Sequence, residues 1–146
     1  MQDSIDTGVN IPFGNHLGFV LVKFEGGHSQ VNFEPRPEHM NSFEVAHGGA
    51  LMALLDIAMA TAARSVQSDM GMVTIEMKTS FMLPASGMLH ARGRLMHRTG
   101  SMAFVEATVF DAQERACAHS TGTFKYMKRT PADAKGGNAR SGISTD

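Results

Sequence analysis

The sequence is poor in cysteine and has no excess of charge of either sign. Cys117 is the single cysteine among 146 residues, so no disulfide can form within the chain, and this usage suits a reducing cytoplasm. The formal net charge is −1, and charges of both signs are scattered along the chain. This distribution gives no electrostatic footprint for nucleic acid or an anionic membrane. We therefore expect a cytoplasmic protein that binds neither.

Several recognisable motifs are also missing. The N-terminus, MQDSIDTGVN, lacks the basic and apolar regions of a signal peptide. No internal repeat is visible, which excludes solenoids and propellers. Seven histidines invite comparison with metal sites, but none forms an HxH or HExxH pair, so we expect no metal or other cofactor. The lack of a GxSxG elbow and of a P-loop argues against a serine hydrolase and against phosphoryl transfer.

What the chain does have is one long apolar stretch, AHGGALMALLDIAMATAARSV, from Ala46 to Val66. Ala, Leu and Met are strong helix formers and no proline interrupts the run, so a helix is predicted from Ala50 to Val66. A helix that is apolar on all sides is a buried one. At about 26 Å it can cross a small domain. It is too short and too rich in alanine for a membrane span.

Asp56 lies in the middle of this predicted helix. Burying an unpaired carboxylate is costly, or else its pKa rises until the group is neutral. Arg64, the nearest cation in the helix, is two turns away. Two interpretations follow. Asp56 is either a structural carboxylate that accepts hydrogen bonds from a neighbouring strand, or a general base or nucleophile in a cleft beside the helix.

His47, Gly48 and Gly49 precede the helix. The first N–H groups of a helix have no intrahelical partner, and glycine lets a ligand approach them closely. Such a helix start is a ready site for an oxyanion, although a plain tight turn would use the same glycines. An acid on the helix and bare amides at its start are the two halves of an acyl-transfer site.

Strand patterns flank the helix on both sides. We expect a loose start at Met1–Asn10, a short helical turn beginning at Ile11–Phe13, and a loop at Glu38–Ala46 that leads into the helix. The predicted strands are Leu17–Glu25 and His28–Glu34, joined by Gly26-Gly27, and after the helix Met72–Leu83, Met88–Arg98, Ser101–Asp111 and Arg115–Met127.

This order predicts an α+β fold in which an antiparallel sheet of about six strands wraps around one long buried helix. Residues 1–14 would form an N-terminal segment, 15–127 the domain, and 128–146 a disordered tail without aromatic residues. One helix cannot cover the whole sheet, and at least one edge strand remains. Dimerisation would cover both.

The segment from Asn41 to Gly49, NSFEVAHGG, followed by a helix carrying Asp56, resembles the signature of hotdog-fold acyl-CoA thioesterases, most closely the phenylacetate-pathway type. In order and spacing the resemblance covers roughly Ile11 to Met127. It implies the hotdog fold and a homodimer, often a dimer of dimers. It also implies hydrolysis of acyl-CoA thioesters without a metal.

The resemblance also implies roles for individual residues. The Gly48 N–H and the Asn41 side chain would polarise the thioester carbonyl, and Asp56 would activate water or attack directly. His47 would orient the loop or hydrogen-bond near the carbonyl. Thr74 falls where the family has a serine or threonine that helps to place the water.

The position of Thr74 on its strand and the contacts to CoA need separate comment. Strict alternation groups Thr74 with Glu76 and Lys78 on the more polar face of its strand. For CoA itself, the candidates are Gly49 and two residues that flank the Thr99-Gly100 turn, Arg98 and Ser101. An arginine beside a turn is also commonly a solvated charge.

The sequence therefore predicts an acyl-CoA thioesterase. A non-catalytic module that binds or senses acyl-CoA on the same fold is the first alternative, although ligand binding alone does not need a buried acid. A hotdog hydratase is the second. It would need a histidine paired with an acid on one overhanging segment, and the sequence shows no such pair.

Overall fold

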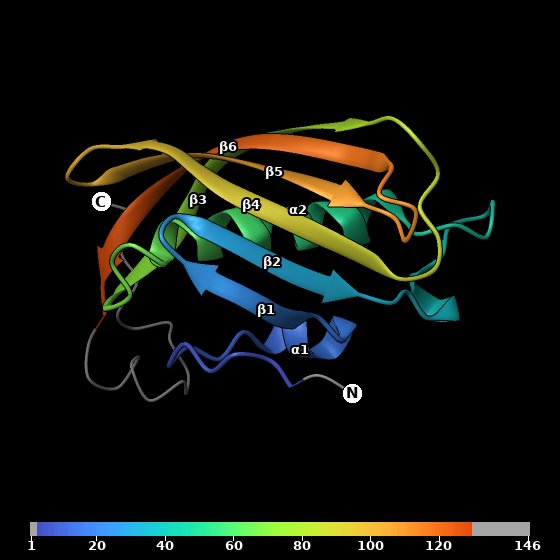
Figure 1. Cartoon of the computed structure of the whole chain (residues 1–146), viewed down its shortest axis with the longest axis horizontal. Coiled ribbons are helices and arrows are strands. Elements are labelled where there is room, and N and C mark those ends of the chain that lie inside the picture. The colour runs from blue at the N-terminus through green and yellow to red at the C-terminus, as the bar shows by residue number, and fades with distance from the viewer. Residues whose placement is uncertain (1–2, 130–146) are drawn as a thin grey trace.

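The structure, a computed structural model, describes residues 3–129. Six strands form one antiparallel sheet in the spatial order β1-β2-β4-β5-β6-β3, and the sheet curls around helix α2 (Figure 1). The elements are α1 (Pro12–Leu17), β1 (Val20–Glu25), β2 (His28–Phe33), η1 (Pro37–His39), α2 (Gly48–Arg64), β3 (Met70–Phe81), β4 (Leu89–Arg98), β5 (Met102–Phe110) and β6 (Ala116–Lys128). The predicted fold class is confirmed.

Helix α2 begins at Gly48 and ends at Arg64, two residues earlier at each end than predicted. Its start is fixed by His47, whose ring Nδ1 accepts a hydrogen bond of 2.8 Å from the Gly49 N–H. A cap of this kind satisfies an amide that the helix leaves free, so the helix includes both glycines. Leu54 and Leu55 are fully buried against the sheet. No helix within residues 3–129 is long and apolar enough to cross a membrane.

Strand β4 approaches α2 most closely at Gly93. A Cβ atom at this position would lie only 2.4 Å from the Ala58 carbonyl oxygen and 2.6 Å from Ser29 Oγ. That hydroxyl donates a buried hydrogen bond of 2.6 Å to the same carbonyl. Because Gly93 has no Cβ atom, the helix and the sheet can approach this closely.

A bulge in β3 reverses the alternation of its side chains between the two faces of the sheet. The register with β6 shifts between Thr74 and Glu76, so that Ile75 has no partner. Thr74 pairs with Phe124, which is fully buried, and thus lies on the face toward the helix. Glu76 pairs with Thr123 and accepts a 2.7 Å hydrogen bond from its hydroxyl on the other face. The predicted grouping of Thr74 with Glu76 is wrong, because one extra residue reverses the alternation.

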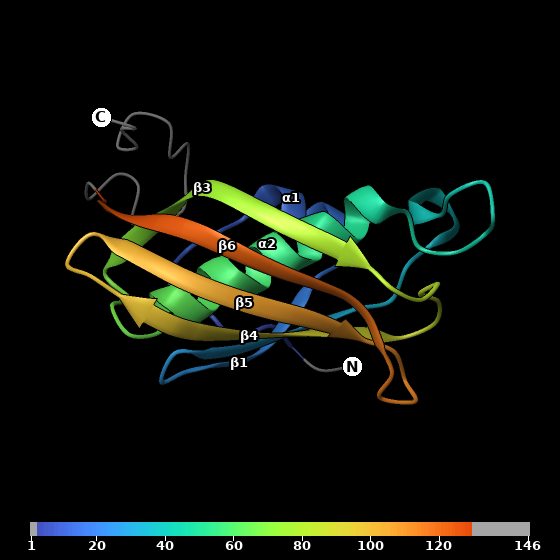
Figure 2. The same ribbon diagram turned by 90° about the horizontal axis from the view of Figure 1, so that it is seen from above.

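Strand β3 is also the edge of the sheet and pairs on one side only, with β6 (Figure 2). Ile75 is 53% exposed and Phe81 is 52% exposed, and Met82 and Leu83 directly after the strand are exposed as well. A long edge strand with apolar side chains is a surface that proteins normally cover.

The N-terminal segment lies along β1. The Ile5 N–H donates to the Leu21 carbonyl at 2.9 Å, and the Leu21 N–H donates to the Ser4 hydroxyl at 3.0 Å. The loose start predicted for Met1–Asn10 is therefore wrong for these residues, because backbone hydrogen bonds hold them to the sheet. At the other end β6 reaches Lys128, and the rest of the predicted tail, from 130 onward, lies outside the described residues.

Candidate active site

Asp56 and Thr74 form a direct pair between α2 and β3. The Thr74 hydroxyl donates to Asp56 Oδ1 at 2.6 Å. Burial raises the pKa of the Asp56 carboxyl above its ordinary value, and the hydrogen bond from Thr74 acts in the opposite direction without cancelling the effect of burial. A half-buried carboxylate of this kind is a stronger base than an exposed one.

A cavity of about 350 Å³, which we name the Asp56 cavity, opens beside this pair. Successive turns of α2 form one wall of the cavity, because residues spaced by three and four lie on the same face of a helix. The sheet and the N-terminal segment close the other sides. Its lining includes Asp56, Ile57, Ala60, Thr61 and Arg64 of α2, Leu21, Val31, Met72 and Thr74 of the sheet, and Ile5, Thr7, Val9 and Ile11 of the N-terminal segment.

The start of α2 borders a second cavity of about 620 Å³, which we name the Asn41 cavity because Asn41 and Gly48 both line it. Asn41 Oδ1 accepts hydrogen bonds from the N–H groups of Phe43 at 2.9 Å and Val45 at 3.3 Å. The carboxamide oxygen is therefore occupied within the loop, and the NH₂ group is the part of Asn41 that can donate to a ligand.

The two glycines of the motif are used differently. The Gly49 N–H donates to the His47 ring, whereas Gly48 occupies the first helical position, where the N–H has no intrahelical acceptor. His47 thus caps the start of the helix. Its two predicted roles, to orient the loop or to hydrogen-bond near the carbonyl, stay predictions. Gly48 is the better of the two amides for polarising a carbonyl. The contact predicted between Gly49 and the substrate stays a prediction.

Arg98 and Ser101 lie outside both cavities. The Arg98 guanidinium stacks over the Tyr126 ring at 4.1 Å from its centroid, and Nη2 donates to Gln67 Oε1 at 2.7 Å. The Ser101 carbonyl accepts from the Tyr126 N–H at 2.8 Å. These contacts tie the β4–β5 hairpin to its neighbours. The assignment of Arg98 and Ser101 to CoA binding stays a prediction.

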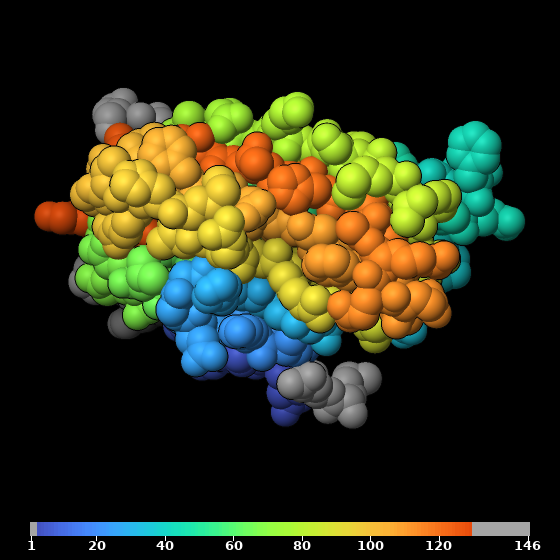
Figure 3. All heavy atoms as spheres, turned by 45° about the horizontal axis from the view of Figure 1, so that its top comes forward, coloured from blue at the N-terminus to red at the C-terminus, as the bar shows by residue number. Residues whose placement is uncertain are grey.

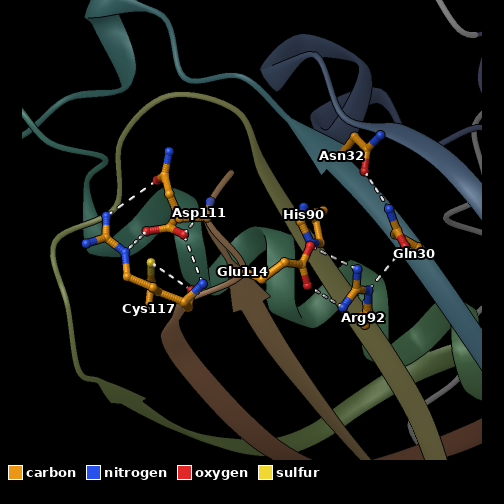
Figure 4. Close-up of polar contacts among 9 residues, drawn as sticks. Gln30, Asn32, His90, Arg92, Asp111, Glu114 and Cys117 are labelled. Carbon is orange, nitrogen blue, oxygen red and sulfur yellow. Dashed lines mark hydrogen bonds and ion pairs between the residues drawn. The ribbon is translucent and has the colours of Figure 1, made fainter.

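A separate polar network lies on the outer face of the sheet (Figure 4). Arg92 donates to both carboxylate oxygens of Glu114, at 3.0 and 3.3 Å, and to Gln30 Oε1 at 3.3 Å. Side chains of β4, β5 and β6 cover this outer face in the space-filling view (Figure 3). None of the three residues lines either cavity, and their charges are matched to one another. We assign this network to the stability of the sheet.

The structure thus brings the predicted residues together as two pairs. Asp56 and Thr74 line one cavity, and Asn41 and Gly48 line the other. Gly48 and Asp56 are eight residues apart on one helix, which corresponds to about 12 Å along its axis. The sequence analysis missed the wall made by the N-terminal segment. Its scattered apolar residues carry no periodic signal that would have placed them there.

Comparison with known proteins places this fold in a family. A model of the thioesterase superfamily matches residues 43–118, which is just over half of the chain and includes the start of α2 and Asp56. A protein of Saccharolobus solfataricus that bears the name "putative esterase" is 29% identical over 120 residues, which cover 82% of this chain and 85% of that protein.

Solved structures agree with this result. The conserved protein PA5202 from Pseudomonas aeruginosa is 26% identical, with a TM-score of 0.78 over 82% of this chain and 97% of that one. A mutant of the phenylacetic acid degradation protein PaaI from Thermus thermophilus is also 26% identical, with a TM-score of 0.72 over 79% of this chain and 98% of that one. With its six-stranded sheet around one long helix, the chain belongs to the thioesterase superfamily.

Proposed function

We propose that the protein hydrolyses acyl-CoA thioesters to a free acid and CoA in a reducing cytoplasm. Membership of the superfamily supports hydrolysis of thioesters in general. The observation that carries the proposal is the Asp56 carboxylate, which faces a cavity, is held by Thr74 and has a raised pKa. A base with a raised pKa is better matched to proton transfer near neutral pH.

The residues divide the reaction between them. The Asn41 NH₂ and the Gly48 N–H donate to the carbonyl oxygen, which gains negative charge as the carbonyl carbon is attacked. Asp56 removes a proton from the attacking water, or attacks the carbon itself to form an anhydride that water then opens. Thr74 holds Oδ1, which leaves Oδ2 for the water. The carbon–sulfur bond breaks, and the CoA thiolate leaves and is protonated.

We further propose that each site is completed by a second copy of the chain. Donors to the carbonyl oxygen and the base must both lie within about 3 Å of the groups they serve, but one helix separates Gly48 from its own Asp56 by about 12 Å. A two-fold axis would set Gly48 beside Asp56 of the partner subunit and make two equivalent sites. The uncovered apolar edge of β3 supports such a homodimer, and the family resemblance extends it to a dimer of dimers.

A thiol-release assay over a panel of aliphatic and aromatic acyl-CoAs tests the enzymatic proposal. We expect release of CoA from at least one member of the panel by the wild-type protein, and at least ~10²-fold slower release by the Asp56→Asn variant. The alternative is the non-catalytic module on the same fold. Measurable binding of an acyl-CoA without release from any panel member would favour that module and refute the enzyme.

A further inference from the structure

Arg64 is a buried cation in the lining of the Asp56 cavity. The residue is only 8% exposed. Nε donates to the Met70 carbonyl at 2.8 Å, and Nη2 donates to the carbonyls of Thr7 at 2.9 Å and Ser68 at 2.5 Å. All three acceptors are neutral backbone groups. None of the hydrogen bonds that Arg64 makes to residues 3–129 uses Nη1, which carries two further N–H donors.

Among residues 3–129, no direct ion pair neutralises the charge of Arg64. No carboxylate in the described part of the chain lies within ion-pair distance of its guanidinium. Burial and the neighbouring Arg129, which also lines the cavity, lower the pKa of Arg64, and Asp69 raises it to a smaller extent. A buried guanidinium without a carboxylate is costly, and carboxylates are the anions that its planar geometry binds best.

The cavity has a different chemistry at each end. Along α2 it runs from Asp56 through Ile57 and Ala60 to Arg64, over about 12 Å of helix axis. At the Asp56 end lies the carboxylate that we assign to attack on the thioester. Between the two ends, α2 contributes the aliphatic side chains of Ile57 and Ala60 and the hydroxyl of Thr61. At the Arg64 end lie two guanidinium groups, those of Arg64 and Arg129. A matching ligand has a thioester, a short hydrocarbon chain and an anionic terminus.

We propose that the substrate is the CoA thioester of a dicarboxylic acid, with its free carboxylate bound at Arg64. This inference rests on the proposed function, because it takes Asp56 as the group at the reacting end. Ile57 and Ala60 contact the methylene groups between the two ends. The competing explanation is that Arg64 only ties the N-terminal segment and the turn after α2 to the helix. That role would give no preference for a charged acyl group.

The test compares matched pairs of substrates. For chains of about four to eight carbons, the range we assign to a cavity about 12 Å long, kcat/KM is measured for the monothioester of each dicarboxylic acid and for the neutral acyl-CoA of equal length. We expect the wild-type enzyme to prefer the carboxylated member by about 10-fold or more at the best length, the size of one hydrogen bond to a charged group. Equal or faster hydrolysis of the neutral member at every length overturns the proposal.

The Arg64→Gln variant should lose this preference, so that its kcat/KM values for the carboxylated and neutral members of a pair become equal within a few-fold. Arg92→Gln, which removes an arginine from the outer face of the sheet, is the matched control and should keep the preference. A preference that survives in a folded Arg64→Gln protein contradicts the assignment to Arg64. If this variant does not fold, the wild-type ratio and the binding experiment described next decide.

Binding separates this proposal from the proposed function. Titration of the Asp56→Asn variant with the same pairs of thioesters measures affinity without turnover. Tighter binding of the carboxylated member supports the dicarboxylate site even if no thioester is ever hydrolysed. Equal or weaker binding of the carboxylated member refutes the site even if the protein proves to be an efficient thioesterase for neutral acyl groups.

Discussion

Asp56 places a carboxylate in the middle of the largely apolar helix α2, and its burial lowers local stability. The pKa of this group is raised by burial, so the folded protein binds a proton there more readily than the unfolded chain does. The free energy of unfolding therefore falls as pH rises from the unfolded-state pKa through the higher folded-state pKa. Residues with this sign of effect are kept for function more readily than for stability.

The Asp56→Asn variant should consequently lose activity by at least ~10²-fold without becoming less stable. Asparagine keeps the oxygen that accepts from Thr74 and removes the buried charge. We subtract the wild-type free energy of unfolding from that of the variant at each pH. This difference should be larger at pH 7 than at pH 4, because only the wild-type carboxylate ionises between these values. Urea denaturation of both proteins at the two pH values measures this. A variant that is less stable at pH 7 would show that the charge itself stabilises the fold.

Thr74 should control the pH at which the enzyme becomes active. Its hydrogen bond lowers the pKa of Asp56, so Thr74→Val should raise that pKa further and move the acidic limb of the kcat/KM profile to higher pH. Thr123→Val is the control, because it removes a threonine hydroxyl that donates to Glu76 on the outer face. Its acidic limb should coincide with that of wild type. An unshifted limb in Thr74→Val would mean that Asp56 does not titrate in catalysis.

At the scale of the element, the contact between β4 and α2 depends on Gly93. Gly93→Ala would place a methyl group against the Ala58 carbonyl and force helix and strand apart, so we expect a loss of about 1–3 kcal/mol in the free energy of unfolding. The matched control is Gly100→Ala in the β4–β5 turn, where an added Cβ meets no atom within 4 Å. Thermal denaturation of both variants decides. Equal melting temperatures would mean that the sheet can move away from the helix at little cost.

The elements themselves were largely predictable, because periodicity and turn residues act locally. The run of Ala, Leu and Met around Asp56 predicted α2, and Gly26-Gly27 predicted the first hairpin, where both glycines indeed have positive φ. The bulge at Ile75 was not predictable. It inserts one residue into an otherwise regular alternation and leaves no compositional mark, yet it decides that Thr74 faces Asp56.

The candidate residues could be named from the sequence, but the walls around them could not. Asn41, His47, Gly48 and Asp56 lie in one stretch that resembles a family signature, and this resemblance singled them out. The N-terminal segment reaches the Asp56 cavity through contacts between residues far apart in the chain, such as the hydrogen bond from Arg64 to the Thr7 carbonyl. No local pattern encodes such a contact, because it depends on how the whole sheet curls around the helix.

At the scale of the whole molecule, the unpaired edge of β3 is the surface on which the proposed dimer depends. Ile75→Lys would place a charge at the bulge on that edge, where it disfavours pairing with another strand. We expect a shift from dimer to monomer in analytical ultracentrifugation, accompanied by loss of activity. Met96→Lys is the control, because Met96 is also an exposed apolar residue at a bulge, but on β4, which β5 and β6 separate from the β3 edge. This variant should stay dimeric. A dimeric, active Ile75→Lys protein would place the interface elsewhere.

Complementation tests directly whether each site spans two chains. Asn41 and Asp56 line different cavities of one chain, so the Asn41→Ala and Asp56→Asn homodimers each carry one defect in both of their sites and should be nearly inactive. A heterodimer of the two variants gathers both defects in one site and leaves the other intact. After free exchange of subunits, half of the dimers are mixed and each has one good site, so about a quarter of wild-type activity should return. Proven exchange without recovered thiol release would mean that a single chain forms the whole site. The separation of Gly48 and Asp56 along α2 would then have to be overcome by a movement within the chain.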